Sequence, residues 1–258
     1  MHSKWIPWTC AVAAVAGASV ASAADHRPIT LSSVPVIGTD NTELFGHAAY
    51  EFGREARVQV PGPGNENGDY DNLRLGPLGF RYGLTDDFEY GAYFSFVSNS
   101  DDDDGAPDDS GLEGITGFAK LQLNRHFALE LGARAGGDED VRPYPNDGLD
   151  FYVNLPMQRD LGPGLVYGEF GYTIQDEDVG GTYASWGIGY AHPLDTGTNL
   201  NFELRGDENP EVSGSNHMDL IVGAGLQVEQ VHLRPYVGLG LYDASPDVSF
   251  GIGASLPL

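Results

Sequence analysis

The chain has almost no cysteine. Its 258 residues include a single one, Cys10, which lies in a segment that we expect to be cleaved off as a signal peptide. The mature protein would then carry no disulfide, no thiol nucleophile and no cysteine-ligated metal, although secretion would permit disulfides. Disulfide scaffolds and cysteine chemistry are therefore excluded.

Basic residues are also scarce. Lysine and arginine together number 13 against 38 aspartates and glutamates, which gives a formal net charge of −25. Nucleic-acid binding needs a basic footprint to neutralise phosphates, so we predict no nucleic-acid partner. Electrostatic binding to anionic lipid surfaces is disfavoured for the same reason.

Long hydrophobic runs are confined to the first residues. An apolar stretch from Trp5 to Val20 follows Lys4 and ends at the small-x-small site Ala21-Ser22-Ala23. This pattern predicts a signal peptide over residues 1–23. No later run reaches the length of a membrane helix, so a membrane role would have to be carried by strands.

Short segments of alternating apolar and polar residues fill the rest of the chain. Between residues 248 and 258, Val248, Phe250 and Ile252 share one parity, and Ser249 and Gly251 share the other. A period of two predicts a strand with two unlike faces. Such segments lie near residues 46–58, 73–84, 88–97, 112–123, 127–136, 149–157, 165–174, 183–192, 198–205, 217–228, 231–242 and 248–257.

The connections between these segments alternate between short turns and long acidic loops. Most segments have about the ten residues that a tilted membrane strand needs, and short turns opposite long loops are typical of bacterial outer-membrane barrels. We therefore predict an all-β protein, a 12-stranded antiparallel transmembrane β-barrel over residues 43–258, in the outer membrane of a Gram-negative bacterium. A soluble sandwich with one wet face is the alternative.

Residues 24–42 precede the first predicted strand. We assign them to a periplasmic N-terminal leader, because Pro28 and Pro35 exclude a full strand. The sequence leaves open whether this leader hangs in the periplasm or folds into the lumen as a plug.

The two faces of the predicted barrel differ in chemistry. The outward parity carries aromatic residues such as Phe94, Phe170 and Trp186, whereas charges of both signs gather on the inward parity. We predict that these inward residues set the polarity of the lumen and pair across it. The predicted lumen-lining residues are Arg81, Glu89, Lys120, Glu130, Arg134, Glu169, Glu203, Arg205 and Arg234.

Glycines replace the charges on the inward parity of three segments. They are Gly187, Gly189, Gly238, Gly240, Gly251 and Gly253. Two interpretations stay open: a bare wall beside a groove for a small solute, or relief of crowding where a small barrel closes.

The passage Phe80–Gly91 has the form of a strand, the turn Gly83-Leu84-Thr85-Asp86, and a strand rich in aromatic residues and glycine. It resembles the outer-membrane transporters grouped as the meta-pathway phenol-degradation family. The resemblance implies a channel-like barrel, and it offers no catalytic residues to carry over.

We predict a monomeric channel for passive passage of small solutes, surrounded by outer-membrane lipid and lipopolysaccharide, with no enzymatic activity. The mixed charges of the lumen predict weak ion selectivity. We expect a preference for cations, because the long acidic loops at the mouth of the barrel concentrate them. One alternative is a structural or surface-interaction barrel with a closed lumen and cation-binding acidic loops. Another is an outer-membrane lipid hydrolase, which needs a lipid-facing histidine; we assign this outward position to His47 alone.

We predict no cofactor. The acidic loop over residues 98–111 offers candidates for a loosely bound calcium or magnesium ion at the cell surface: Asp101, Asp102, Asp103 and Asp104. These residues do not form an EF-hand, because Gly111 stands where the bidentate glutamate would be required.

Overall fold

The computed structural model describes residues 28–58, 66–101, 110–138, 148–176, 182–194, 198–208, 216–242 and 245–258. Twelve antiparallel strands make a closed barrel. The strands are β1 (Thr42–Val58), β2 (Glu66–Thr85), β3 (Phe88–Asp101), β4 (Ser110–Asn124), β5 (Phe127–Ala135), β6 (Leu149–Leu161), β7 (Gly164–Ile174), β8 (Tyr183–Pro193), β9 (Asn199–Glu208), β10 (Asn216–Val228), β11 (Val231–Gly240) and β12 (Val248–Pro257). The predicted fold class and the number of strands are confirmed.

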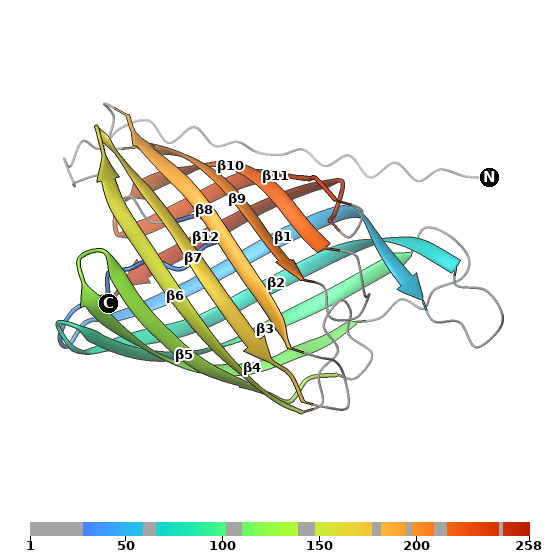
Figure 1. Ribbon diagram of the computed structural model, residues 1–258, viewed down its shortest axis with the longest axis horizontal. Coiled ribbons are helices and arrows are strands. Elements are labelled where there is room, and N and C mark those ends of the chain that lie inside the picture. Colours follow the sequence, from blue (N-terminus) through green and yellow to red (C-terminus); the bar gives the residue numbers. More distant parts are fainter. Residues whose placement is uncertain are drawn as a thin grey trace.

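Each strand pairs with its neighbours in sequence, and β12 pairs with β1 to close the wall (Figure 1). Closure satisfies the backbone groups that an open sheet would leave at its edges. Several strands are longer than their alternation predicted: β2 begins at Glu66, β3 continues to Asp101, and β6 continues to Leu161. Their added residues are largely polar, so no alternating pattern marks them, yet the backbone pairing continues.

The short connections lie at one end of the barrel. The turns of two residues are Asp86-Asp87, Arg125-His126, Gly162-Pro163 and Glu229-Gln230. At the same end, the backbone N–H of Leu258 donates to the carbonyl of Thr42 at 2.8 Å, so the C-terminus lies beside the start of β1. This end is on the left in Figure 1.

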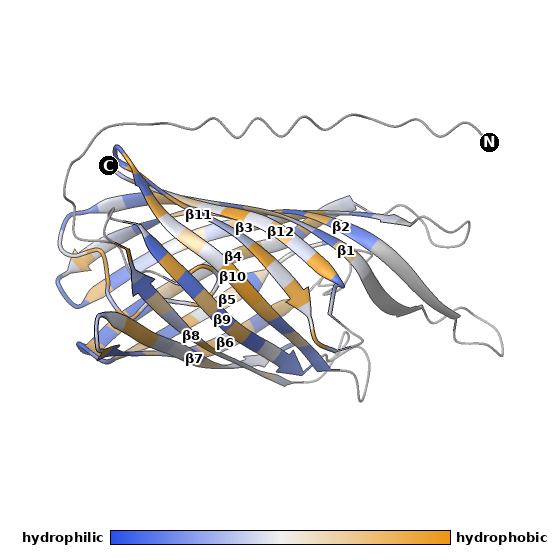
Figure 2. Ribbon diagram, turned by 90° about the horizontal axis from the view of Figure 1, so that it is seen from above, coloured by the Kyte–Doolittle hydropathy of each residue, from blue (hydrophilic) through white to orange (hydrophobic). Residues whose placement is uncertain are grey.

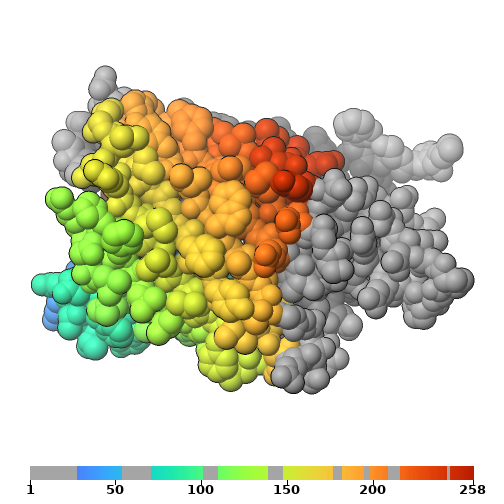
Figure 3. Space-filling model, viewed as in Figure 1, coloured from blue at the N-terminus to red at the C-terminus, as the bar shows by residue number. Residues whose placement is uncertain are grey.

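The distribution of side chains is the reverse of that in a soluble protein. Large apolar side chains are exposed on every strand, among them Ile115, Phe170 and Ile188. Figure 2 shows hydrophobic and hydrophilic residues alternating along the strands, and Figure 3 shows the outer surface of the barrel wall. Buried polar side chains such as Glu89 and Glu203 face inward. Because a closed barrel with an apolar outer surface is stable in lipid, the protein is an outer-membrane β-barrel.

Within the described part of the chain, no helix is long and apolar enough to cross a membrane.

A charge placed on the outer wall should oppose membrane folding. Ile188 lies in the middle of β8 with 53% of its side chain exposed, so Ile188→Arg should cost about 2–4 kcal/mol of folding free energy in lipid. Equilibrium unfolding in phospholipid vesicles measures this cost, and Ile188→Val is the matched control. Equal stability of the arginine variant and wild type would contradict a lipid-facing position.

Most of the described part of the leader lies inside the barrel. Residues 28–41 form no strand, and the side chains of Ile29, Leu31 and Val34 are 6%, 8% and 1% exposed. Of the two locations left open by the sequence, residues 28–37 occupy the lumen rather than the periplasm. The predicted signal peptide, residues 1–23, lies outside the described residues.

Candidate functional site

The first described residues of the leader contact the barrel wall at Glu203, the fifth residue of β9. Its carboxylate accepts hydrogen bonds from the backbone N–H groups of Ile29 at 2.6 Å and Thr30 at 3.1 Å, and from the Thr30 hydroxyl at 2.6 Å. The Tyr167 hydroxyl donates to the same carboxylate at 2.8 Å. With four donors around it, a carboxylate that is 1% exposed holds the leader against β9.

Glu169 on β7 holds the next part of the leader. It accepts a hydrogen bond from the backbone N–H of Ser32 at 2.8 Å and another from the Asn154 side-chain amide at 2.9 Å. The same amide donates to the Ser32 hydroxyl oxygen at 3.2 Å. Two wall carboxylates thus bind leader N–H groups that a strand partner would otherwise satisfy.

A charge cluster on β3 and β4 holds the following residues. Lys120 lies 2.8 Å from Glu89 and donates to the carbonyls of Ser33 and Pro35, each at 3.2 Å. Glu89 in turn accepts the backbone N–H of Ile37 at 2.8 Å. The leader therefore crosses the lumen from β9 and β7 to β3 and β4.

Arg81 extends this cluster along β2. Its guanidinium lies 2.6 Å from Glu43 and 3.4 Å from Glu89. Glu43 precedes the predicted first segment at residues 46–58, so its position in the lumen wall was missed. Glu43 is the second residue of β1, so its ion pair with Arg81 lies next to the end of the leader.

The last leader residues attach to the turn between β2 and β3. The backbone N–H of Asp40 donates to the Gly83 carbonyl at 2.8 Å, and the Thr39 hydroxyl donates to Asp86 at 2.7 Å. Hydrogen bonds from the Thr39 side chain and backbone lower the pKa of Asp86 below its usual value of 3.8. This anchor is exposed, in contrast to the buried contacts of Glu203.

The glycine-rich wall is not bare. Side chains from the leader and from neighbouring strands cover the glycines predicted on it: a Cβ at Gly187 would lie 2.5 Å from a methyl group of Leu31, and Gly251 accommodates the ring of Tyr236. Of the two interpretations that the sequence left open, relief of crowding is therefore favoured over a bare wall, because these side chains need the space that a Cβ would fill.

Gly223, which the prediction did not single out, makes room for Ile29 in the same way. Ile29 packs with Ile221 and Tyr236, and Leu31 packs with Tyr167 and Ala191. These are the two buried apolar clusters among the described residues, and the leader supplies one member of each.

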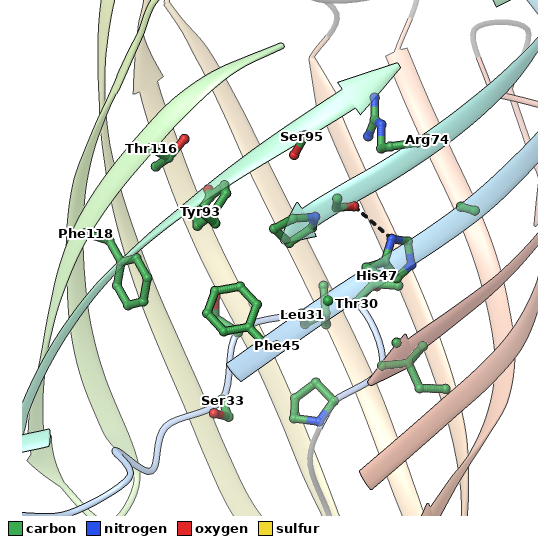
Figure 4. A pocket seen from close by; sticks show the side chains of 18 of the residues that line it. Thr30, Leu31, Ser33, Phe45, His47, Arg74, Tyr93, Ser95, Thr116 and Phe118 are labelled. Carbon is green, nitrogen blue, oxygen red and sulfur yellow. Dashed lines mark hydrogen bonds between the residues drawn. The ribbon is translucent and has the colours of Figure 1, made fainter. Parts of the chain in front are cut away.

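Cavities of different size lie beside the described part of the leader. The larger has a volume of about 500 Å³ and is lined by leader residues from Pro28 to Ser33 together with polar and aromatic side chains of the wall (Figure 4). The smaller, of about 240 Å³, also touches Thr30 and Leu31. The leader therefore forms part of the wall of both spaces.

The nine predicted lumen residues all lie on the inner side. Those that line the larger cavity are Arg81, Glu89, Lys120, Glu130, Arg134, Arg205 and Arg234. Glu169 lines the smaller cavity, and Glu203 is buried beneath the leader. The structure thus gives three of the glutamates, Glu89, Glu169 and Glu203, a specific partner, the leader, which the sequence did not assign.

Ion pairs connect several of these side chains to acids in the wall. Arg134 lies 2.6 Å from Asp150, and Arg205 lies 3.0 Å from Asp219. Arg74, absent from the prediction, lies 3.0 Å from Glu113.

The prediction that His47 faces outward is wrong. His47 lines the larger cavity, where its ring nitrogens lie 3.1 Å from the Gly76 carbonyl oxygen and 2.9 Å from the Tyr236 hydroxyl (Figure 4). It shares its parity in β1 with Glu43 and Glu51, which face inward. The hydrolase alternative therefore loses its candidate histidine at the lipid surface.

The predicted surface cation site falls largely outside the described residues. Asp101 is the last residue of β3, and Asp102 to Asp104 follow it beyond the described part of the chain. Among the described residues, no group of three or more histidine, cysteine, aspartate or glutamate side chains is placed to hold a metal ion.

Solved structures support the same architecture. An outer membrane channel from Pseudomonas putida F1 superposes with a TM-score of 0.65 at 14% identity, covering 90% of this chain and 100% of the channel. The β domain of the Bordetella autotransporter BrkA gives a TM-score of 0.50 at 11% identity, covering 85% of this chain and 100% of that domain. No family model and no curated protein matches the chain. The class defined by the fold is a 12-stranded outer-membrane β-barrel of Gram-negative bacteria.

Proposed function

We propose that the protein is a channel for passive passage of small solutes, closed in this structure by its own leader and conducting when the leader moves out of the lumen. The observation that carries this proposal is the way the leader is held. Glu203, Glu169, Glu89 and Lys120 bind its backbone from opposite walls, and cavities remain beside it.

The mode of attachment favours a removable plug. Carboxylate contacts with backbone N–H groups can be exchanged for water without breaking any pairing between strands, so the barrel survives release of the leader. The resemblance of Phe80–Gly91 to the meta-pathway phenol-degradation transporters supports a channel of this kind. We further propose a monomer surrounded by lipid and lipopolysaccharide, with surface cations held at Asp101 to Asp104.

A disulfide between leader and wall tests the proposal. A Cβ at Gly187 would lie 3.2 Å from the Leu31 Cγ, which places a sulfur within reach in the double variant Leu31→Cys/Gly187→Cys. Because the only native cysteine is Cys10, in the expected signal peptide, the new pair has no competitor. Planar-bilayer recordings should show at least a tenfold lower open probability in the oxidised than in the reduced protein, a difference of about 1.4 kcal/mol or more.

The single variant Leu31→Cys is the control and should not respond to reductant. Equal conductance of the oxidised and reduced double variant would contradict the role of the leader as the gate. Absence of any single-channel step from wild type and from the reduced variant would contradict the proposal that the protein is a channel. That last outcome would favour the second candidate, a structural barrel, which the filling of the lumen by Ile29 and Leu31 also supports.

A further inference from the structure

The larger cavity concentrates the few cations of a strongly acidic chain. The whole sequence has 13 lysines and arginines against 38 acids. Among the described residues, six of the cations and only five of the acids line this cavity. The cations are Arg74, Arg81, Lys120, Arg134, Arg205 and Arg234.

In the arginine ion pairs of this wall, the guanidinium side chain is more exposed than the acid that it pairs with. The Arg205 side chain is 27% exposed and that of Asp219 is 1% exposed, while Arg134 is 19% exposed against 4% for Asp150. The Arg74 side chain is also more exposed than that of its partner Glu113, with 23% against 10%. A solute in the cavity therefore meets guanidinium groups that are more exposed than their carboxylate partners, and two of those partners, Asp150 and Asp219, do not line the cavity.

The arginines reach this space from separate parts of the barrel. Arg74 comes from β2, Arg134 from β5, Arg205 from β9 and Arg234 from β11. Several guanidinium groups can thus act on one bound anion, and each presents a planar fork that matches a carboxylate. Partial exclusion of water strengthens that attraction relative to the exposed loops.

The cavity also offers apolar surface beside the charges. Phe45 and Phe118 line it, with Tyr93 between them at ring-centroid distances of 6.2 Å to each (Figure 4). Its volume of about 500 Å³ lies within the range of about 300–1,000 Å³ that is usual for small-molecule sites. Carbon skeletons can contact the rings while a carboxylate faces the arginines.

We propose that the larger cavity is a binding chamber for small organic carboxylates, which makes the channel prefer anions to cations. This inference rests on the proposed channel function and names the class of solute. It reverses the cation preference expected from the acidic mouth, because ions at exposed loops are screened by salt whereas ions in the chamber are screened less.

Reversal potentials of the full chain in a sodium acetate gradient test the selectivity. We expect acetate to permeate roughly threefold more readily than sodium in wild type, and the ratio to fall to about one or below in Arg74→Gln/Arg205→Gln/Asp219→Asn. The Asp219 change removes the more deeply buried of the two acids that would otherwise lose a cation, since Asp219 is 1% exposed and Glu113 is 10% exposed, so the barrel should still fold. Arg159→Gln, at an exposed position near the end of β6, is the matched control and should leave the ratio unchanged.

Calorimetric titration of the detergent-purified full chain with succinate gives a second readout that needs no conductance. We expect binding by wild type and by Arg159→Gln, and at least tenfold weaker binding by the triple variant. Succinate binding without any conductance would contradict the proposed channel function but would still support the binding chamber. A wild-type preference for sodium, or succinate binding that the triple variant retains in full, would overturn the chamber.

Discussion

Glu203→Gln is expected to free the first part of the leader while leaving the barrel intact. The substitution keeps the size of the side chain but removes its charge and turns one acceptor oxygen into a donor, which then faces the donors of Ile29, Thr30 and Tyr167. Hydrogen bonds to a charged group contribute about 1.5–3 kcal/mol each. Losing about 3 kcal/mol would raise the fraction of chains with a released leader about a hundredfold.

Hydrogen–deuterium exchange at the amides of Ile29 and Thr30 measures this release directly, and bilayer recordings should show a matching rise in open probability. Glu208→Gln is the matched control, since it removes an exposed carboxylate from the same strand. Unchanged exchange at both amides in Glu203→Gln would show that this carboxylate is not what holds the leader.

Lys120→Met should destabilise the leader and the wall together. The lysine is 2% exposed and Glu89 is fully buried, so the substitution leaves Glu89 with the more distant Arg81 as its cation. Removing one partner of a buried pair costs about 3–5 kcal/mol because the remaining charge is no longer compensated. The carbonyls of Ser33 and Pro35 lose their donor as well.

Urea unfolding in lipid vesicles measures the loss, and the double variant Lys120→Met/Glu89→Gln separates charge from packing. If the uncompensated carboxylate is the cause, the double variant should regain a large part of the stability. A single variant within about 1 kcal/mol of wild type would contradict the proposed role of the pair.

The strand pattern was predictable because every strand of a barrel has one lipid-facing and one inward side. The alternation at Phe250 and Ile252 reports directly on side chains that are 50% and 43% exposed. The polar inward residues were visible for the same reason. Since each strand pairs with the next, the order along the chain also fixed the order around the barrel.

Two β-bulges explain why the alternating pattern did not identify Arg74 and Glu113 as inward-facing residues. The register between β2 and β3 shifts between Leu75 and Leu78, so Arg74 and Arg81 both face inward although their numbers differ in parity. A similar shift in β4, near Gly114, brings Glu113 to the same side as Lys120. Alternation extended across a bulge assigns the wrong face, because the inserted residue advances the count by one.

The path of the leader could not be read from its own residues. Residues 28–41 have neither alternation nor helical periodicity, and their partners Glu203 and Glu169 lie more than 130 positions away. What fixes the leader is the set of donors it offers to buried acids, together with pockets left by Gly187 and Gly223. Neither is a local property of the sequence.

The leader runs directly into β1, since Asn41 is followed by the first strand residue, Thr42. A plug tethered in this way stays at high effective concentration near its binding site after release, because it cannot diffuse away. Its return is a first-order event within one molecule, so the duration of each opening should not depend on how many copies share the membrane. Free leader peptide added at the periplasmic side would have to compete against that local concentration, and would block only those barrels whose own leader is out.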